Sequence, residues 1–303
     1  MGPTLFLLYI NDLFDCLPPD SVIAYADDTT LIASGPTAHA AETALQTLLN
    51  TVYQWSTDNC LHLNPAKCLS MIIAPSKQKA AAAASAPRCA PRINGSAVST
   101  ATSIKILGVI FTSELEWQEQ ARAVRAKVAR KLAVLQRIGG TLNTRTRAQF
   151  YKTCIKPHID YCLPVWAHCG AEQAKLDRTL TRAKQTIANS RCANIEKTDF
   201  KHFCLATFTD LTILAIACQY FNHVHSEDFN ANISLLSQIN KSMSTRASLA
   251  NKSFIQISKK SCDNCFLYSA PKLWNSLPNS VTSQVNFSSF YQNLIQYVFP
   301  AAV

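Results

Sequence analysis

The chain has 303 residues, of which 48% are hydrophobic, and it carries a formal net charge of +10. This apolar fraction is enough for a folded core and excludes wholesale disorder. The positive charge is concentrated, because residues 114–191 alone carry a net charge of +9. A concentrated basic region predicts a surface that contacts nucleic acid, and a merely solubilising surface is the alternative.

The 12 cysteines are scattered along the chain and lack the dense spacing of small secreted disulfide proteins. We therefore expect free thiols and an intracellular protein, nuclear or cytoplasmic and not secreted. No run reaches the roughly 18 apolar residues that a membrane span needs, so no membrane partner is expected. The sequence leaves the oligomeric state open.

The first predicted elements are a short helix and a β-hairpin. Residues 5–13 predict an apolar helix, which the two prolines at 18 and 19 end. Residues 22–26 and 29–33 are apolar and partly β-branched, so they predict two strands joined by a two-residue turn at Asp27 and Asp28. Adjacent carboxylates repel each other in a bare turn, whereas a divalent metal ion binds such oxygens. A solvated acidic turn is the alternative.

The next segments predict one helix and two single strands. Apolar side chains recur at steps of three and four over residues 37–55, which predicts an amphipathic helix packed under the sheet. Residues 69–74 predict a short strand, and residues 104–111 predict a second one with Gly108 at a close backbone approach. Residues 75–91 are rich in Ala and contain three prolines, so they predict a solvated linker.

Three basic amphipathic helices in series then predict a small helical bundle, over residues 114–138, 144–155 and 172–189. A glycine pair at 139 and 140 ends the first helix, and Pro157 ends the second. Basic side chains lie away from the apolar stripes, where a solvated helix face is the alternative to phosphate contacts. The residues predicted to bind nucleic acid are Arg122, Arg125, Arg130, Lys131, Arg178 and Arg182.

The chain is predicted to stay helical from about residue 199 to residue 225. The tail from residue 230 is rich in Ser and Asn and is predicted to be less regular, with a last short helix around Phe290. Trp166 and Trp274 are predicted to pack in the core, and stacking on bases is the alternative.

Several short motifs occur in a fixed order along the chain. They are Gly2-Pro3-x-Leu5-Phe6, Tyr9-Ile10-Asn11-Asp12-Leu13, Tyr25-Ala26-Asp27-Asp28-Thr29, Trp55-x-x-x-Asn59, Asn64-Pro65-x-Lys67, Lys105-x-Leu107-Gly108-Val109, Ile155-x-Pro157-x-Ile159-x-Tyr161 and Ser269-Ala270-Pro271-Lys272-Leu273-Trp274. In this order they resemble the reverse transcriptases of non-LTR (LINE-type) retrotransposons of the jockey and CR1 kind.

The resemblance implies an α+β fold in three parts. Residues 1–112 would be a partial polymerase palm, an antiparallel sheet with packed helices. Residues 113–192 would be a basic, helical, thumb-like region, and residues 193–303 a helical or irregular extension. The implied activity is RNA-directed DNA synthesis, a nucleotidyl transfer that uses an RNA template, a DNA primer, deoxynucleoside triphosphates and two Mg²⁺ ions.

The resemblance also implies roles for single residues. Asp27 matches the main catalytic metal ligand, and Asp28 the secondary one. Lys67 matches a position near the departing pyrophosphate, where it would act as a general acid or stabilise charge; an ordinary surface lysine is the alternative. Leu107 and Gly108 match the primer-grip strand, where a purely structural glycine is the alternative. The same match places Tyr25 beside the hairpin, and an ordinary aromatic residue of the core is the alternative.

In this family a strand with the first catalytic Asp, and the fingers before it, lie upstream of the segment that begins here at Gly2. We therefore expect a truncated chain that lacks this Asp and the fingers and is inactive in isolation. Two alternatives stay open, a non-catalytic nucleic-acid-binding remnant and an inactive pseudogene product.

Overall fold

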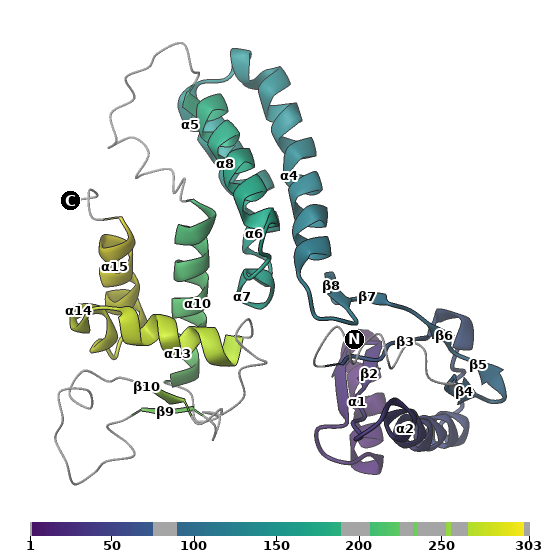
Figure 1. Ribbon diagram of the computed structural model, residues 1–303. Helices are drawn as coiled ribbons and strands as arrows, with labels where there is room; N and C mark the ends of the chain where they lie inside the picture. The colour runs from purple at the N-terminus through teal and green to yellow at the C-terminus, as the bar shows by residue number, and fades with distance from the viewer. Residues whose placement is uncertain are drawn as a thin grey trace, which may run out of the picture. The chain divides into compact units, whose positions relative to one another are not determined.

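The computed structural model of the protein describes residues 2–74, 90–188, 207–224, 233–235, 253–255 and 266–299 (Figure 1). Its contacts divide the chain into two compact units, Met1–Glu116 and Trp117–Val303. The first unit combines short strands with helices and the second is mainly helical, which confirms the predicted α+β class. The finer division at residue 192 stays a prediction, since residues 189–206 lie outside the described ranges.

The first unit begins with a helix that tightens into a 3₁₀ turn before the two prolines, as predicted for residues 5–13. Its elements are α1 (Gly2–Ile10), a 3₁₀ turn (Asn11–Cys16), β1 (Val22–Tyr25), β2 (Asp28–Leu31), α2 (Ala38–Asp58), a second 3₁₀ turn (Pro65–Lys67), β3 (Leu69–Ser70), β4 (Arg92–Ile93), β5 (Ser96–Ala97), β6 (Ser99–Thr100), β7 (Ser103–Ile106) and β8 (Val109–Thr112).

The strands of this unit form separate two-stranded ladders, so the prediction of one antiparallel sheet is wrong for the described residues. β1–β2, β4–β5 and β7–β8 are antiparallel hairpins, whereas β3 and β6 pair in parallel. Each hairpin closes through a two-residue turn, so its strands find their partners locally. The predicted strand over residues 69–74 shrinks to β3. Most of the predicted linker, residues 75–89, lies outside the described ranges.

Helix α2 confirms the amphipathic helix predicted for residues 37–55. The Thr37 hydroxyl accepts a hydrogen bond from the Ala40 N–H at 3.2 Å, which satisfies one free donor of the first turn. On the apolar stripe, Leu48, Val52 and Trp55 are buried. They pack with residues of α1 and its 3₁₀ turn, together with partly buried residues of the hairpin, into one core cluster: Ile10, Leu13, Leu17, Val22 and Leu31.

The second unit is built mostly from helices. Its elements are α4 (Gln118–Ile138), a 3₁₀ turn (Gly139–Thr141), α5 (Thr144–Phe150), a π-helical segment (Tyr151–Ile155), α6 (Lys156–Asp160), α7 (Leu163–Trp166), α8 (Glu172–Ala188), α10 (Phe208–Val224), β9 (Ile233–Leu235), β10 (Ser253–Ile255), α13 (Phe266–Ser276), α14 (Asn279–Thr282) and α15 (Phe287–Val298). Among the described residues of both units, no helix is long and apolar enough to cross a membrane.

Helix α4 starts four residues later than predicted. The Thr112 hydroxyl accepts a hydrogen bond from the Glu116 N–H at 3.0 Å and donates one to the Glu116 carbonyl at 3.2 Å. Leu115 lies in the left-handed region, with φ +53°. These contacts hold residues 112–116 in a turn, so the helix begins only at Gln118.

The second predicted helix does not end at Pro157. It passes from α5 into the π-helical segment, and α6 then starts with Pro157 in its first turn. A proline is tolerated there because the first N–H groups of a helix have no intrahelical acceptor. Pro157 therefore opens a helix, and the chain turns only at Cys162, where φ is +52°.

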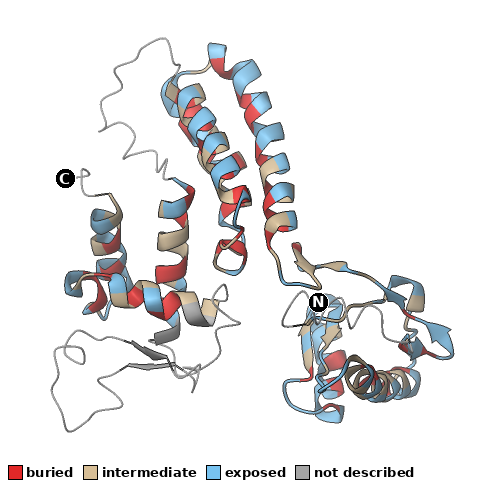
Figure 2. Ribbon diagram, in the orientation of Figure 1, coloured by how far each residue is buried: buried red, intermediate tan, exposed pale blue. Residues whose placement is uncertain are grey.

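The core of the helical bundle lies between α4 and α8. Five apolar residues of α4 are buried, Ala121, Val124, Val128, Leu132 and Leu135, and four apolar residues of α8, Leu176, Leu180, Ala183 and Ile187. Figure 2 shows these buried positions running along the two helices. The predicted stripes are thus confirmed, except that Ile138, the last residue of the first stripe, stays 39% exposed.

A second apolar cluster joins α10, α13 and α15. Trp274 lies between two aromatic rings, with centroid distances of 5.3 Å to Tyr220 and 5.8 Å to Phe290. Trp274 and Trp166 are 1% and 0% exposed, which confirms core packing for both. The predicted last helix is α15, whereas the expectation of an irregular tail is wrong for residues 266–282, which form α13 and α14.

We predict that Leu135→Ala destabilises the second unit by about 2–5 kcal/mol, because it removes a fully buried side chain and leaves a cavity. Val134→Ala on the same helix is the matched control, since Val134 is 41% exposed. Urea unfolding followed by circular dichroism measures both. Equal losses of stability would contradict the packing of α4 described above.

Candidate functional site

The acidic hairpin is confirmed, but its turn lies one residue earlier than predicted. Tyr25 pairs with Asp28, so the two turn residues are Ala26 and Asp27, and Asp28 is the first residue of β2. Ala26 has φ +53°, and a positive φ at the first turn position is the sign typical of a type II′ turn. A non-glycine residue in this region costs about 1–2 kcal/mol, and such strain gathers at functional sites.

Both carboxylates are exposed at the end of this hairpin. Within the described parts of the chain, no side-chain hydrogen bond or ion pair engages Asp27 or Asp28, and no cluster of three or more His, Cys, Asp or Glu residues has metal-binding geometry. One or two carboxylates, with waters and substrate phosphates, suffice for one Mg²⁺ ion. The donor set therefore fits one ion.

Tyr25 does not pack in a core. Its side chain is 69% exposed, and that of Ile23, two residues earlier on the same face of β1, is 57% exposed. Alternate residues of β1 are half-buried toward the cluster under the hairpin. The prediction that Tyr25 is a packed aromatic is thus wrong for the described structure, and an apolar face of the hairpin is open.

Two hydrogen bonds beneath the hairpin involve residues that belong to the motifs named above. The Trp55 indole donates to the Asp12 carboxylate at 3.2 Å, and the Tyr9 hydroxyl donates to the Asn59 carbonyl. These bonds join α1 and its 3₁₀ turn to α2. Asp12 therefore has a structural partner.

Lys67 is exposed at the end of a short 3₁₀ turn. The Asn64 side-chain oxygen accepts a hydrogen bond from the Ala66 N–H at 3.1 Å and so caps this turn. The Asn64-Pro65 pair thereby fixes the backbone that carries Lys67. The role of Lys67 near a pyrophosphate stays a prediction.

Leu107 and Gly108 do not lie within one strand, as the sequence suggested. They are the turn of the β7–β8 hairpin, in which Ile106 pairs with Val109. Their φ angles are +45° and +87°, and two positive values are typical of a type I′ turn, which favours glycine. The positive φ thus gives a structural reason for a glycine at position 108. The primer-grip role of this hairpin turn stays a prediction.

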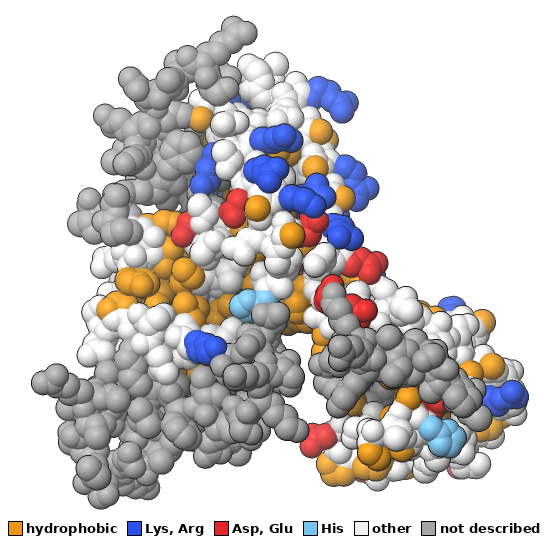
Figure 3. All heavy atoms as spheres, viewed as in Figure 1, with side chains coloured by type: hydrophobic (Ala, Val, Ile, Leu, Met, Phe, Trp, Pro, Cys, Tyr) orange, Lys and Arg blue, Asp and Glu red, His pale blue; other side chains and the backbone are white. Residues whose placement is uncertain are grey.

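The six basic residues predicted to bind nucleic acid fall into two groups. Arg130, Lys131, Arg178 and Arg182 are exposed on α4 and α8. Arg122 and Arg125, in contrast, make ion pairs within the bundle. Figure 3 shows Lys and Arg side chains gathered over the region that Figure 1 labels α4, α5 and α8. The described structure therefore offers a basic surface on the second unit.

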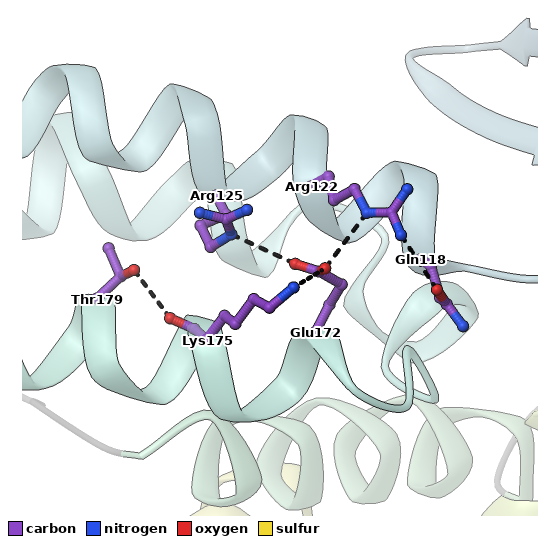
Figure 4. A network of polar contacts seen from close by, with 6 residues as sticks. All are labelled: Gln118, Arg122, Arg125, Glu172, Lys175 and Thr179. Carbon is purple, nitrogen blue, oxygen red and sulfur yellow. Dashed lines mark hydrogen bonds and ion pairs between the residues drawn. The ribbon is translucent and has the colours of Figure 1, made fainter.

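The two paired arginines converge on Glu172, whose side chain is 2% exposed (Figure 4). The Nε atoms of Arg122 and Arg125 each lie 3.3 Å from a different carboxylate oxygen, and Lys175 Nζ lies 2.7 Å from one of them. The hydrogen bond from Lys175 is the largest cause that lowers the pKa of Glu172, and Arg122 lowers it further, against the opposing effect of burial. Glu172 is therefore ionised and ties α8 to α4.

Our sequence reasoning missed Glu172. The signal was its position, four residues before Leu176, which puts a carboxylate on the buried stripe of α8. A buried charge needs partners, so this position predicts a cation on the facing helix. Which cation it is depends on packing that the sequence pattern does not contain.

Residues 1–111 match the family model described as reverse transcriptase (RNA-dependent DNA polymerase). The chain is 27% identical over 213 residues to an RNA-directed DNA polymerase from the mobile element jockey of Drosophila melanogaster, which covers 65% of this chain and 22% of that protein. It is 23% identical over 199 residues to a retrovirus-related Pol polyprotein from the type-1 retrotransposable element R1 of Bradysia coprophila, with coverages of 64% and 18%. It is 25% identical over 171 residues to a similarly named R1 protein of Nasonia vitripennis, which covers 54% of this chain and 41% of that protein.

No solved structure matches the chain. The chain spans less than half of the length of each of these relatives. Residues 1–111 are thus similar to a reverse-transcriptase domain. The relatives are proteins of non-LTR retrotransposons, which confirms the resemblance drawn from the motifs.

We predict that Glu172 makes the second unit sensitive to acid. Its pKa in the folded protein lies below the ordinary value of 4.5, so its stabilising contribution is present above pH 4.5 and is lost as the pH falls through the folded pKa. Glu172→Gln should therefore show a weaker loss of stability on acidification than the unchanged protein. Thermal unfolding measured from pH 7 down to pH 3 tests this.

The exposed Glu119 of α4 gives the control for that measurement. Glu119→Gln removes the same charge from a solvated position and should leave the acid dependence unchanged. Equal acid dependence in the Glu172→Gln variant and the unchanged protein would contradict a native ion pair at Glu172.

Proposed function

We propose that the chain is part of an RNA-directed DNA polymerase of a non-LTR retrotransposon. In this proposal residues 1–112 belong to the palm and residues 113–192 to a thumb-like region. The substrates are an RNA template, a DNA primer and deoxynucleoside triphosphates. The observation that carries the proposal is the pair of exposed carboxylates at the end of the β1–β2 hairpin, inside the segment that matches the reverse-transcriptase family.

Asp27 and Asp28 would hold Mg²⁺ through their carboxylate oxygens. When bound, such ions neutralise the charge on the transferring phosphoryl group. The strained turn at Ala26 supports this role, because it presents Asp27 away from the paired strands. In the same proposal Lys67 stabilises the leaving pyrophosphate, and the β7–β8 turn at Leu107 and Gly108 approaches the primer backbone.

A non-catalytic nucleic-acid-binding remnant is the second candidate, and a specific observation favours it. The described residues supply two carboxylates, whereas a two-ion site needs further ligands. The basic surface of α4 and α8 needs no metal to bind phosphates. An intracellular location fits either candidate, because the seven cysteines in the described ranges are unpaired.

We predict that the chain binds one Mn²⁺ or Mg²⁺ ion at the hairpin and that Asp27→Asn with Asp28→Asn abolishes this binding. Paramagnetic broadening by Mn²⁺ of NMR signals from residues 22–31 measures it directly. Asp15→Asn with Asp20→Asn is the matched control, since it removes two exposed carboxylates from the neighbouring loop. Binding that survives in the hairpin variant would overturn the assignment of Asp27 and Asp28.

We also predict no primer extension by the isolated chain on an RNA template with Mg²⁺, because the described residues offer no cluster of donors for a second ion. Incorporation of labelled deoxynucleotides measures this. Extension that disappears in Asp27→Asn would instead mean that the chain completes its own two-ion site, and it would exclude the non-catalytic remnant.

A further inference from the structure

Glu172 contacts only one nitrogen, Nε, of each arginine that it binds. The carboxylate accepts hydrogen bonds from the Nε atoms of Arg122 and Arg125. A guanidinium group has five N–H donors in a rigid fork, so the four N–H groups on the two terminal nitrogens of each side chain remain. One terminal nitrogen of Arg122 donates to Gln118 at 3.3 Å. Figure 4 shows both guanidinium groups reaching Glu172 from α4, with a dashed contact from one terminal nitrogen of Arg122 to Gln118.

The arginine side chains are accessible, whereas the carboxylate is not. The side chains of Arg122 and Arg125 are 58% and 36% exposed, against 2% for Glu172. Lys175 is 48% exposed and completes the cluster. Three positive charges thus surround one enclosed negative charge, and the excess charge faces solvent. An approaching anion meets the cations first.

We propose that Arg122, Arg125 and Lys175 form a binding site for the phosphates of a nucleic-acid backbone, and that Glu172 is its positioning residue. A carboxylate that fixes each guanidinium through Nε leaves the terminal nitrogens to face a phosphate, which the planar fork of arginine suits. In Arg122 one of these nitrogens is shared with Gln118. The proposal rests on the nucleic-acid binding proposed above. It adds that a buried acid, by orienting two arginines, increases affinity for a polyanion.

The proposal differs from an ordinary electrostatic account in the sign of one effect. If charge alone governs binding, removing any carboxylate from the basic unit strengthens its attraction for phosphate. If Glu172 orients the arginines, its neutralisation weakens binding although the net charge of the protein rises. A purely structural ion pair also predicts no loss of affinity in a variant that stays folded.

The experiment measures binding of the full chain to a short RNA–DNA duplex by fluorescence anisotropy across a salt series, without Mg²⁺. We expect Glu172→Gln to bind about tenfold more weakly, the scale of one charge-assisted hydrogen bond. The slope of log affinity against log salt should fall by about one. Glu119→Gln makes the same change of charge at an exposed position of α4 and should bind as well as the unchanged protein, or slightly better.

A second variant keeps the test decisive if Glu172→Gln fails to fold. Arg125→Lys preserves the charge, and Arg122 and Lys175 still pair with the Glu172 carboxylate. The substitution removes one of the two guanidinium groups. We expect it to bind several-fold more weakly with an unchanged circular dichroism spectrum, since a lysine is a point charge. Arg125→Lys that binds normally would overturn the site.

Glu172→Gln that folds and binds as tightly as Glu119→Gln would equally overturn the proposal. So would an unchanged protein that does not bind the duplex at low salt. None of these results concerns the metal site, because Mn²⁺ binding at Asp27 and Asp28 is measured separately and on the other unit. Failure of the phosphate site and failure of the polymerase proposal are therefore distinguishable.

Discussion

The burial of one apolar stripe on α4 against α8 is the constraint on which the second unit depends. Once Val124, Val128 and Leu135 face Leu176 and Leu180, the rotation of both helices about their axes is set. Residues one or two positions away from the stripe must then lie at its edge or in solvent. The packing of aliphatic side chains thereby determines where the cations of this unit are displayed.

The same constraint separates two kinds of basic residue that look alike in the sequence. Arg130 and Lys131 fall on the outer face, where water solvates them. Arg122 and Arg125 fall beside the end of the stripe, where α8 begins with Glu172. Because that carboxylate is enclosed, leaving it unpaired would be costly, and the nearest cations on α4 pair with it. The core thus selects which arginines become ordered.

Much of the helical structure was predictable from the sequence. The stripes of α2, α4 and α8 recur every three or four residues over more than four turns, and burial of a long periodic face leaves few alternative structures. Shorter features were less predictable. The helix over residues 144–155 continues through a π-helical segment, because Pro157 could stand in a new first turn as easily as it could end the old helix.

The hairpins show why the candidate site was predicted only in part. The acidic pair and its flanking strands were evident from the sequence. The register of the hairpin, however, depends on the positive φ at Ala26, and an alanine does not predict a left-handed conformation. Likewise, the sequence from Ile104 to Phe111 predicts one strand. The structure has a hairpin there, because Leu107 and Gly108 both adopt a left-handed conformation. Local backbone conformation at these three residues determined which side chains lie at the hairpin tips.

Glu172 could not be paired from the sequence for a different reason. Its partners on α4 lie 50 and 47 residues away, and only the packing of two helices brings them together. The two candidate functions of the chain therefore rest on different physics. Metal binding needs carboxylates placed by a turn of two residues, so it depends on few donors. Phosphate binding draws on several cations displayed by a long helical core, so it tolerates the loss of one. A chain that lost the metal site would, on these grounds, retain nucleic-acid binding.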